Sequence, residues 1–256
     1  MYKQHENYKE LIWVLAKTDF RLRYHGSFFG YLWVVLKPLL TFAVLNFVFS
    51  FMFNSGDTYS LQLLVGLIIY FFFAEGTSAG MTSLLSKAQL VTKIYVPRWT
   101  IIVASTVNAT MVFLMNLVVI AFFFTIKGFV PSFVSVLIFF VFSIFTYILI
   151  LSFSLITAPL YVKFRDLSMI WEVLLMVILY ASPIIYPLSS LPTKYHVILL
   201  LNPLAFIINF TKEALIFNRF TIPPHYVAIF SVIVLAGFAL GIFSYRKLIP
   251  NVAEEI

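Results

Sequence analysis

The chain of 256 residues contains no cysteine and has few charged side chains. Without cysteine it has no disulfide bond, no catalytic thiol and no cysteine-ligated metal site. Only 11% of its residues are charged, whereas an ordinary soluble domain carries about 25%. A water-soluble globular protein is therefore not expected, because its surface could not be covered with polar groups.

Sequence motifs for enzymatic chemistry are also missing. No GxxxxGK[ST] sequence occurs, so the chain has no P-loop of its own with which to bind ATP. The histidines are far apart in the sequence and form no HExxH pair, which leaves no metal site to predict. We expect a protein without a catalytic site, metal or cofactor of its own, with a membrane enzyme as a disfavoured alternative.

Apolar residues are abundant: 62% of the chain is hydrophobic, and the mean hydropathy is +1.02. These values predict an all-α polytopic membrane protein. The 17 Lys and Arg residues outnumber the 10 Asp and Glu residues and give a net charge of +7. In a membrane protein this excess holds loops on the cytoplasmic side and contacts anionic lipid, so no nucleic acid partner is expected.

Long apolar runs with few charges predict six membrane-spanning helices, since a helix needs about 20 apolar residues to cross about 30 Å of hydrocarbon. The predicted spans are residues 28–53, 61–85, 99–126, 133–157, 167–185 and 224–245. Pro159 is expected to mark the end of the fourth span. A further apolar run, residues 195–211, carries Asn202-Pro203 in its middle. It predicts a re-entrant helical hairpin in the outer leaflet, within a gate segment of about residues 190–219, in preference to a seventh span.

The distribution of basic residues predicts that both termini are cytoplasmic. With the N-terminus inside, thirteen of the 17 Lys and Arg residues fall on the inner side. The four outer residues are Lys127, Lys194, Lys212 and Arg219. Residues 1–25 are predicted to form an amphipathic cytoplasmic helix ahead of a transmembrane domain of residues 26–256. This helix is either a membrane-surface anchor or a docking surface for a cytoplasmic partner.

Three charged residues, Lys37, Glu75 and Glu172, fall within the predicted spans. Glu75 lies inside the second span and is a functional candidate by default. Glu75 is either a proton or ion site, as in a proton-coupled secondary transporter, or a residue that forms a structural polar contact with a neighbouring helix. Glu172 and Lys37 lie near predicted span ends and are expected to snorkel toward the interface.

Four blocks of sequence resemble type-2 ABC permeases that export polysaccharides. The segment Arg21-Leu-Arg-Tyr24-His-Gly-Ser27-Phe-Phe-Gly30-Tyr-Leu-Trp33 is similar to the start of the first span in that family. Residues 90–98 and 164–167 resemble its inside loops, and residues 182–204 resemble its outer gate segment. The blocks occur in the family's order and cover most of the chain.

This resemblance implies the permease subunit of an ATP-driven exporter. The family works as a homodimer with two separate ATP-binding cassette subunits, which bind ATP and Mg²⁺ in place of this chain. The substrate would be a polysaccharide linked to undecaprenyl diphosphate, with O-antigen ahead of teichoic acid and capsule. The exporter would move it from the cytoplasmic to the outer leaflet of the bacterial inner (plasma) membrane.

The resemblance also implies roles for individual residues. A lipid-pyrophosphate entrance would be formed by Arg21, Arg23, Tyr24, Ser27 and Gly30. Coupling to the ATPase would use Lys87, Lys93, Arg98, Arg165 and Asp166. Aromatic candidates along a pathway between spans one and five are Tyr31, Trp33, Phe42 and Tyr180. The outer gate would contain Pro183, Tyr186, Pro187, Asn202 and Pro203. Guanidinium groups suit bidentate phosphate binding, although the entrance arginines could instead anchor to lipid headgroups.

Overall fold

The computed structural model describes residues 7–53, 56–93, 96–220 and 222–252. Every secondary-structure element in this part of the chain is helical, which confirms the predicted all-α class. Some sequence predictions fall on residues outside the described part: 1–6 of the N-terminal segment, 94–95 of the first inside loop, and 253–256.

Five helices in the described ranges are long and apolar enough to cross a membrane. They are α2 (Leu32–Phe53), α3 (Gly56–Ser86), α5 (Arg98–Ile126), α6 (Phe133–Lys163) and α10 (Pro224–Leu248). They correspond to the first four predicted spans and the sixth. The chain is therefore a polytopic membrane protein, as its composition predicts.

The helix at the fifth predicted span, α7 (Leu167–Ala181), is shorter than the others. Its 15 residues give a length of about 22 Å at the helical rise per residue. It ends before Ser182 because the residue that precedes a proline is disfavoured in the α region, and Ser182 is extended with φ −100° and ψ 151°. A membrane crossing by α7 stays a prediction.

Helix α6 extends beyond its predicted end. The prediction that Pro159 ends this helix is wrong, because α6 continues through that residue to Lys163. Pro159 is buried, and neighbouring helices commonly re-satisfy the backbone groups that a proline leaves free in a membrane helix.

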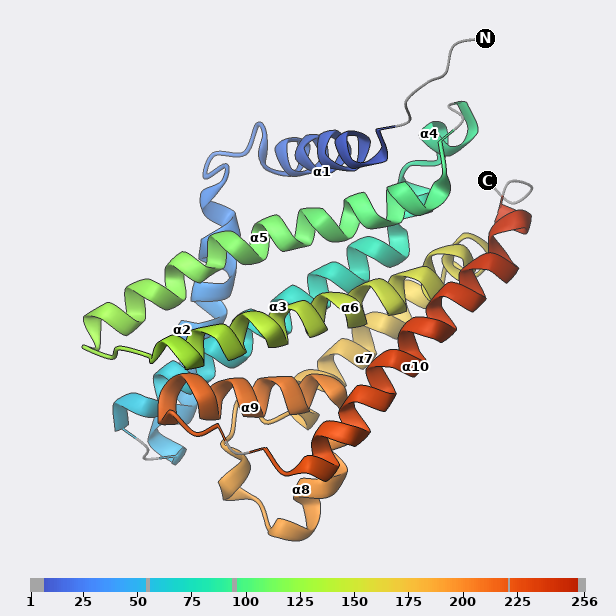
Figure 1. The fold of residues 1–256 in the computed structure, drawn as a ribbon. Helices are drawn as coiled ribbons and strands as arrows, with labels where there is room; N and C mark the ends of the chain where they lie inside the picture. Colours follow the sequence, from blue (N-terminus) through green and yellow to red (C-terminus); the bar gives the residue numbers. More distant parts are fainter. Residues whose placement is uncertain (1–6, 54–55, 94–95, 221, 253–256) are drawn as a thin grey trace.

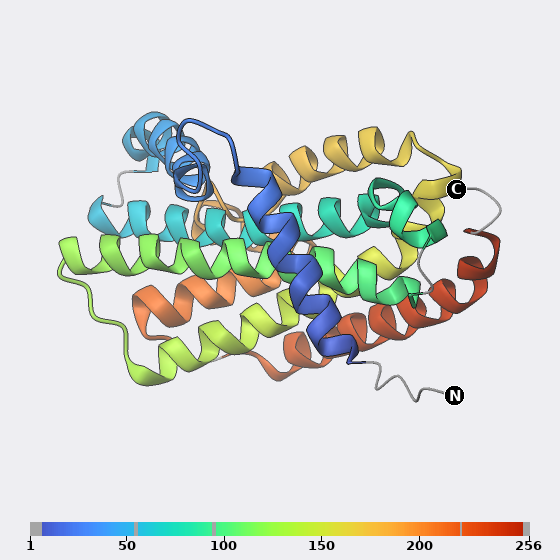
Figure 2. The ribbon, with the colours of Figure 1, turned by 90° about the horizontal axis from the view of Figure 1, so that it is seen from above.

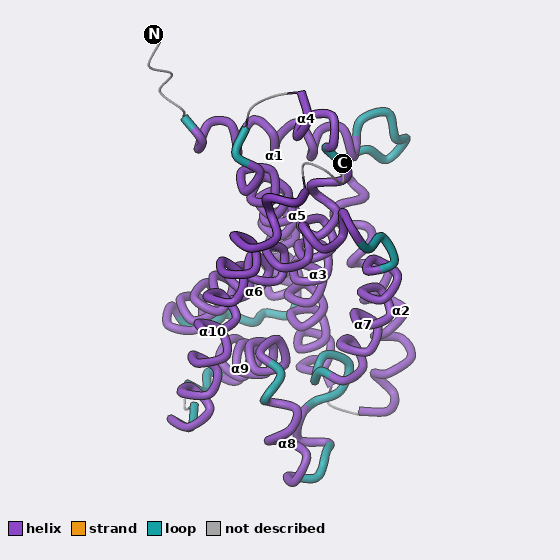
Figure 3. Tube along the Cα trace, turned by 90° about the vertical axis from the view of Figure 1, so that its right-hand side faces the viewer, coloured by secondary structure: helices purple, strands orange, loops and turns teal. Residues whose placement is uncertain are grey.

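Helices α8 (Thr193–Leu200) and α9 (Pro203–Phe217) form the predicted hairpin, with a bend of 116° between them. The side chain of Asn202 accepts a hydrogen bond from the Leu204 N–H at 3.0 Å and caps α9. Pro203 follows as the first residue of α9, where the missing N–H is not needed. Figure 3 shows α8 at the opposite end of the bundle from α1 (Tyr8–Tyr24) and α4 (Ala88–Lys93).

Helix α3 is at the centre of the bundle. In its most apolar stretch 72% of the residues are buried, compared with 17% in α2 and in α10. Gly76 and Gly80 of α3 let α6 approach closely, since a Cβ atom on Gly76 would lie 2.8 Å from the side chain of Ile150. Helices α2, α5, α6, α7 and α9 all pack against α3.

Helix α1 lies across the bundle instead of along it (Figures 1 and 2). It packs on α5, where the Asn108 amide donates to the carbonyl oxygen of Ala16 at 3.3 Å. Ala16 is buried in this contact, whereas Asp19 is partly buried and the other charged residues of α1 are exposed. This arrangement brings the C-terminal residues of α1 beside α2 and α3.

Candidate functional site

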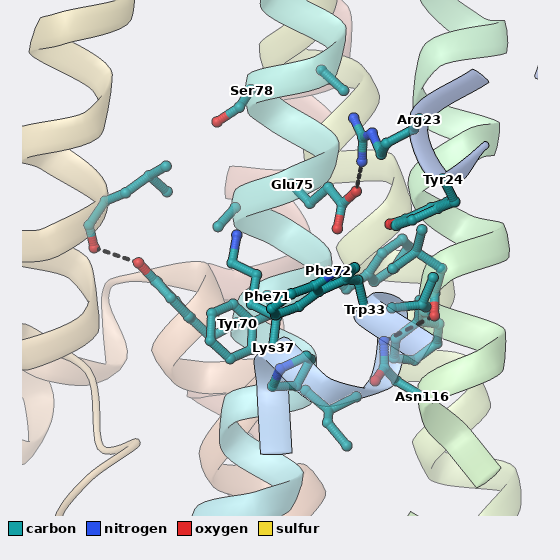
Figure 4. A pocket seen from close by; sticks show the side chains of 18 of the residues that line it. Arg23, Tyr24, Trp33, Lys37, Tyr70, Phe71, Phe72, Glu75, Ser78 and Asn116 are labelled. Atoms are coloured by element: carbon teal, nitrogen blue, oxygen red, sulfur yellow. Dashed lines mark hydrogen bonds and ion pairs between the residues drawn. The ribbon is translucent and has the colours of Figure 1, made fainter. Parts of the chain in front are cut away.

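A cavity of about 760 Å³ opens beside the C-terminal end of α1 (Figure 4). Its walls come from α1, α2, α3, α5 and α7. The polar side chains that line it are Arg23, Tyr24, Lys37, Glu75, Ser78, Thr82 and Asn116. Its aromatic wall includes Trp33, Tyr70, Phe71, Phe72 and Phe113. Ionisable groups within membrane-crossing helices mark functional sites by default, so this cavity is the candidate site.

An ion pair joins α1 to α3 across the cavity. Arg23 Nη1 donates to Glu75 Oε1, and the two side chains are 43% and 28% exposed. Burial lowers the pKa of Arg23, but the Glu75 carboxylate and Tyr24 outweigh this effect, and the pKa lies above its ordinary value. Burial and Glu75 raise the pKa of Tyr24. At neutral pH the site therefore presents a charged guanidinium next to a protonated hydroxyl.

Lys37 brings a second cation into the cavity from the second turn of α2 (Figure 4). Within the described residues, no side chain forms an ion pair or hydrogen bond with its ammonium group. Lys37 is exposed and lines the same cavity as Arg23 and Glu75, and its snorkelling toward the interface stays a prediction. The cavity thus holds two cations and one carboxylate.

Asn116 of α5 adds a buried amide to the wall. Its Nδ2 donates to the carbonyl oxygen of Val112 at 3.0 Å, while its Oδ1 has no hydrogen-bond partner in the described part of the chain. A buried acceptor left unpaired costs about 1–3 kcal/mol. The sequence predictions missed Asn116, although a polar residue in a charge-free apolar run was a signal.

The predicted entrance residues divide into two groups. Arg23 and Tyr24 line the cavity, whereas Arg21 is exposed on α1. Ser27 and Gly30 belong to the turn between α1 and α2, where the Gly30 N–H donates to the Ser27 carbonyl at 3.0 Å. Gly30 has φ +48°, a left-handed conformation that glycine adopts without strain. The turn sets the direction in which α2 leaves α1.

The predicted pathway aromatics do not lie together. Trp33 lines the cavity. Tyr31 stacks on Phe20 of α1 with ring centroids 5.5 Å apart, and Phe42 is buried in edge contact with an α5 ring at 5.2 Å. Tyr180 is 58% exposed on α7. A pathway role for these residues stays a prediction.

The predicted coupling residues lie in two regions, from the end of α3 to the start of α5 and between α6 and α7, and have different surroundings. Lys87 pairs with Asp19 of α1 and donates to Ser105 at 3.2 Å. Arg98 donates to the carbonyl oxygen of Ile249 at 2.6 Å. Both side chains therefore connect parts of this chain to one another.

The remaining coupling candidates are placed differently. Arg165 and Asp166 are exposed in the turn between α6 and α7, and Lys93 is the last residue of α4. Figure 1 shows this turn at the same end of the bundle as α4 and the end of α10. The turn is accessible to a partner subunit.

The predicted outer gate is bound to α3 and α9. Tyr59 of α3 donates to the carbonyl oxygen of Ile185 at 2.8 Å, and Asn202 donates to Ser182 at 3.4 Å. Pro183 is buried, whereas Tyr186 and Pro187 are partly exposed. The segment that follows α7 is thereby fixed next to the bent pair α8–α9, which begins its second helix at Pro203.

Lys212 is a further member of this group that sequence reasoning did not identify. The sequence places it among the outer charges, but the structure buries it in α9 with 5% exposure. Its ammonium group donates to the carbonyl oxygens of Pro183 and Ile184 at 2.5 and 3.0 Å. A lysine in an otherwise apolar helix was the available signal.

The bundle and its charged cavity define a multi-pass membrane protein of the transport class. Residues 10–216 match the family described as ABC-2 type transporter, and the chain belongs to this family.

Curated relatives cover nearly the whole chain. It is 30% identical over 241 residues to an O-antigen export system permease protein RfbA of Klebsiella pneumoniae, covering 93% of this chain and 92% of the relative. It is 26% identical over 253 residues to a protein of the same name from Myxococcus xanthus, covering 97% and 96%. It is 22% identical over 252 residues to the polysialic acid transport protein KpsM of Escherichia coli, covering 93% of each.

These findings confirm the family prediction. The chain is the membrane permease subunit of an ABC-2 polysaccharide exporter. In this family the permease has no catalytic site, and a partner ATPase binds the nucleotide.

Proposed function

We propose that this permease moves a polysaccharide linked to undecaprenyl diphosphate from the cytoplasmic to the outer leaflet of the bacterial inner membrane. O-antigen is the favoured polymer, because the relatives named for O-antigen export are up to 30% identical, while the polysialic acid protein is 22% identical. Teichoic acid and other capsules are the alternatives.

The observation that carries this proposal is the cavity with Arg23 and Lys37 on neighbouring helices. A diphosphate is a compact, multiply charged anion, and charge-assisted hydrogen bonds are the strong way to bind one. Tyr24 adds a hydroxyl donor, and Trp33 offers an aromatic face on which a sugar ring could stack. The same wall thus has groups for both parts of a lipid-linked sugar.

In this proposal two copies of the chain form a homodimer with two ATP-binding cassette subunits. Helices α2 and α7 support it, since they expose apolar side chains to lipid or to a second copy. These side chains are Leu40, Val44, Phe47 and Phe51 on α2, and Met169, Val173, Met176 and Val177 on α7. The turn with Arg165 and Asp166 would contact the ATPase, which binds ATP and Mg²⁺.

The proposed topology has both termini in the cytoplasm. In support, the crossing helix α1 and the end of α10 lie at the same end of the bundle (Figure 1). The basic residues Arg246 and Lys247 occupy the last turn of α10, as the positive-inside rule favours for a cytoplasmic end.

The test is reconstitution of the permease with its ATPase subunit in proteoliposomes that carry a labelled undecaprenyl diphosphate oligosaccharide. We expect ATP-dependent movement of the label to the opposite leaflet, measured by access of a membrane-impermeant glycosidase. Running the assay with O-antigen, teichoic acid and capsule oligosaccharides ranks the polymers. Transport that needs a proton gradient but no ATPase subunit would contradict the proposal and restore the secondary-transporter interpretation.

A further inference from the structure

The cavity is lined by more cations than carboxylates, and only one of the cations forms an ion pair in the described part of the chain. Arg23 and Lys37 are cations, and Glu75 is the one carboxylate among the residues that line the cavity. Glu75 binds Arg23, so Lys37 is left without an ionic partner among the described residues. Lys37 lines the cavity and is exposed, so its ammonium group is accessible to an anion. This imbalance points to an anion that enters the cavity from outside the chain.

The same anion would have to compete with Glu75. The guanidinium group of Arg23 has five N–H donors, and in the structure its Nη1 is engaged by the Glu75 carboxylate. A phosphate group bound by both Arg23 and Lys37 would lie near Glu75, which lines the same cavity (Figure 4). Two like charges in one site repel each other, and this repulsion weakens the binding of the incoming anion.

The three charges come from three different helices, Arg23 from α1, Lys37 from α2 and Glu75 from α3. Glu75 is fixed on the central helix α3, which is the most buried span. Arg23 lies in the last turn of α1, next to the turn that contains Gly26 and Gly30 at positive φ. The Arg23 side chain is 43% exposed, so it has room to change partner while the carboxylate stays in place.

We propose, on the basis of the proposed function, that Glu75 is an exchangeable counter-ion. It holds Arg23 in the empty subunit, and the phosphate-bearing headgroup of the incoming lipid displaces it to bind Arg23 and Lys37 together. Glu75 then weakens the hold on the headgroup by repulsion, so that the site binds the lipid and also releases it. A transport site needs both properties, since tight binding would stop turnover.

The test measures binding of two probes to the permease–ATPase complex in nanodiscs of zwitterionic lipid. The probes are undecaprenyl diphosphate, which carries the headgroup on a lipid, and inorganic pyrophosphate, which carries it free. Quenching of tryptophan fluorescence gives the affinity, because Trp33 lines the cavity. Glu75→Gln is expected to tighten binding and Lys37→Gln to weaken it, each by roughly tenfold, the factor that corresponds to about 1.4 kcal/mol.

Matched controls make the same chemical changes outside the cavity. They are Glu172→Gln on α7 and Lys247→Gln at the end of α10, neither of which lines the cavity. Both are expected to keep the wild-type affinity. Glu75→Asp keeps the negative charge on a shorter side chain and is expected to bind close to the wild-type level.

The direction of the Glu75→Gln effect decides the inference. Loss of a purely structural ion pair would weaken binding or leave it unchanged, and either result overturns the exchange. Weaker binding in both Glu75 variants overturns it too. Binding of both probes supports a site that recognises the phosphate groups alone. Binding of only undecaprenyl diphosphate supports a headgroup site that also requires the lipid's hydrocarbon tail. Equal quenching by phosphatidylglycerol overturns it, since any anionic lipid would then suffice.

Failure of this inference is distinguishable from failure of the proposed function. If the wild-type complex transports the labelled lipid with ATP while Glu75→Gln binds no more tightly, the exchange is wrong and the function stands. If the wild-type complex moves no lipid-linked sugar with ATP, the function is wrong whatever the affinities of the variants.

Discussion

The ammonium group of Lys212 donates to the carbonyl oxygen of Ile184 at 3.0 Å, although the two residues are 28 positions apart in the chain. The contact attaches the segment after α7 to α9, and Gly66 of α3 provides the room for it. A Cβ atom on Gly66 would lie 2.8 Å from Lys212 Cε. One buried cation therefore joins two parts of the proposed outer gate.

Removal of this cation is expected to loosen the gate segment. Lys212→Met leaves the carbonyl groups of Pro183 and Ile184 without their donor, and an unpaired buried polar group costs about 1–3 kcal/mol. We expect a lower midpoint of thermal unfolding in detergent. Lys194→Met changes an exposed lysine of α8 and should leave the midpoint unchanged, and equal midpoints for the two variants would argue against the gate contact.

Because α3 packs closely against α6, alanine substitution is expected to destabilise the protein at one glycine and not at another. Gly80→Ala places a Cβ atom in contact with Ser154 and 3.2 Å from Thr106, and such overpacking costs about 1–3 kcal/mol. Gly237→Ala on α10 meets no described atom within 4 Å. We expect a lower yield of folded protein and a lower unfolding midpoint for Gly80→Ala only. Comparable stability of both variants would disprove the packing argument.

The exposed turn between α6 and α7 is expected to matter for coupling and not for stability. Asp166→Lys reverses a charge that the structure leaves exposed, so we expect ATP-driven transport to fall by roughly fivefold or more with an unchanged unfolding midpoint. Lys194→Glu reverses a charge at the opposite end of the bundle and serves as the control. Wild-type transport by Asp166→Lys would remove this turn from the docking surface.

Arg98 is expected to affect both stability and coupling. Its hydrogen bond to the Ile249 carbonyl ties the start of α5 to the residues after α10, so Arg98→Ala should destabilise the protein by about 1–2 kcal/mol. Transport per folded complex should fall as well. Arg246→Ala removes an exposed arginine from the last turn of α10 and is the control. If only transport falls, Arg98 contacts the partner and the structural role is wrong.

The positions of the long helices could be predicted because they depend on the length of apolar runs. The hairpin was predictable too, since Asn202 and Pro203 interrupt a short run and cap the following helix. The ends of helices were less predictable. Pro159 sits inside α6 because its neighbours compensate for it, and a single sequence contains no information on those neighbours.

The candidate site was predictable only in part. Arg23 and Tyr24 were identified from the motif that precedes the first span, and Glu75 from its place inside an apolar run. The ion pair between Arg23 and Glu75 joins residues 52 positions apart, and such pairs depend on which helices become neighbours. The same reason explains why Lys37 and Asn116 were not assigned to the cavity.

The short helix α7 has a consequence for the lipid around the protein. A hydrophobic segment shorter than the bilayer is accommodated by local thinning of the membrane, by snorkelling of flanking residues or by oligomerisation. Where α7 meets the lipid, the hydrocarbon barrier would therefore be lower than elsewhere along the permease. A charged headgroup that crosses beside α7 would have a shorter distance to travel away from water.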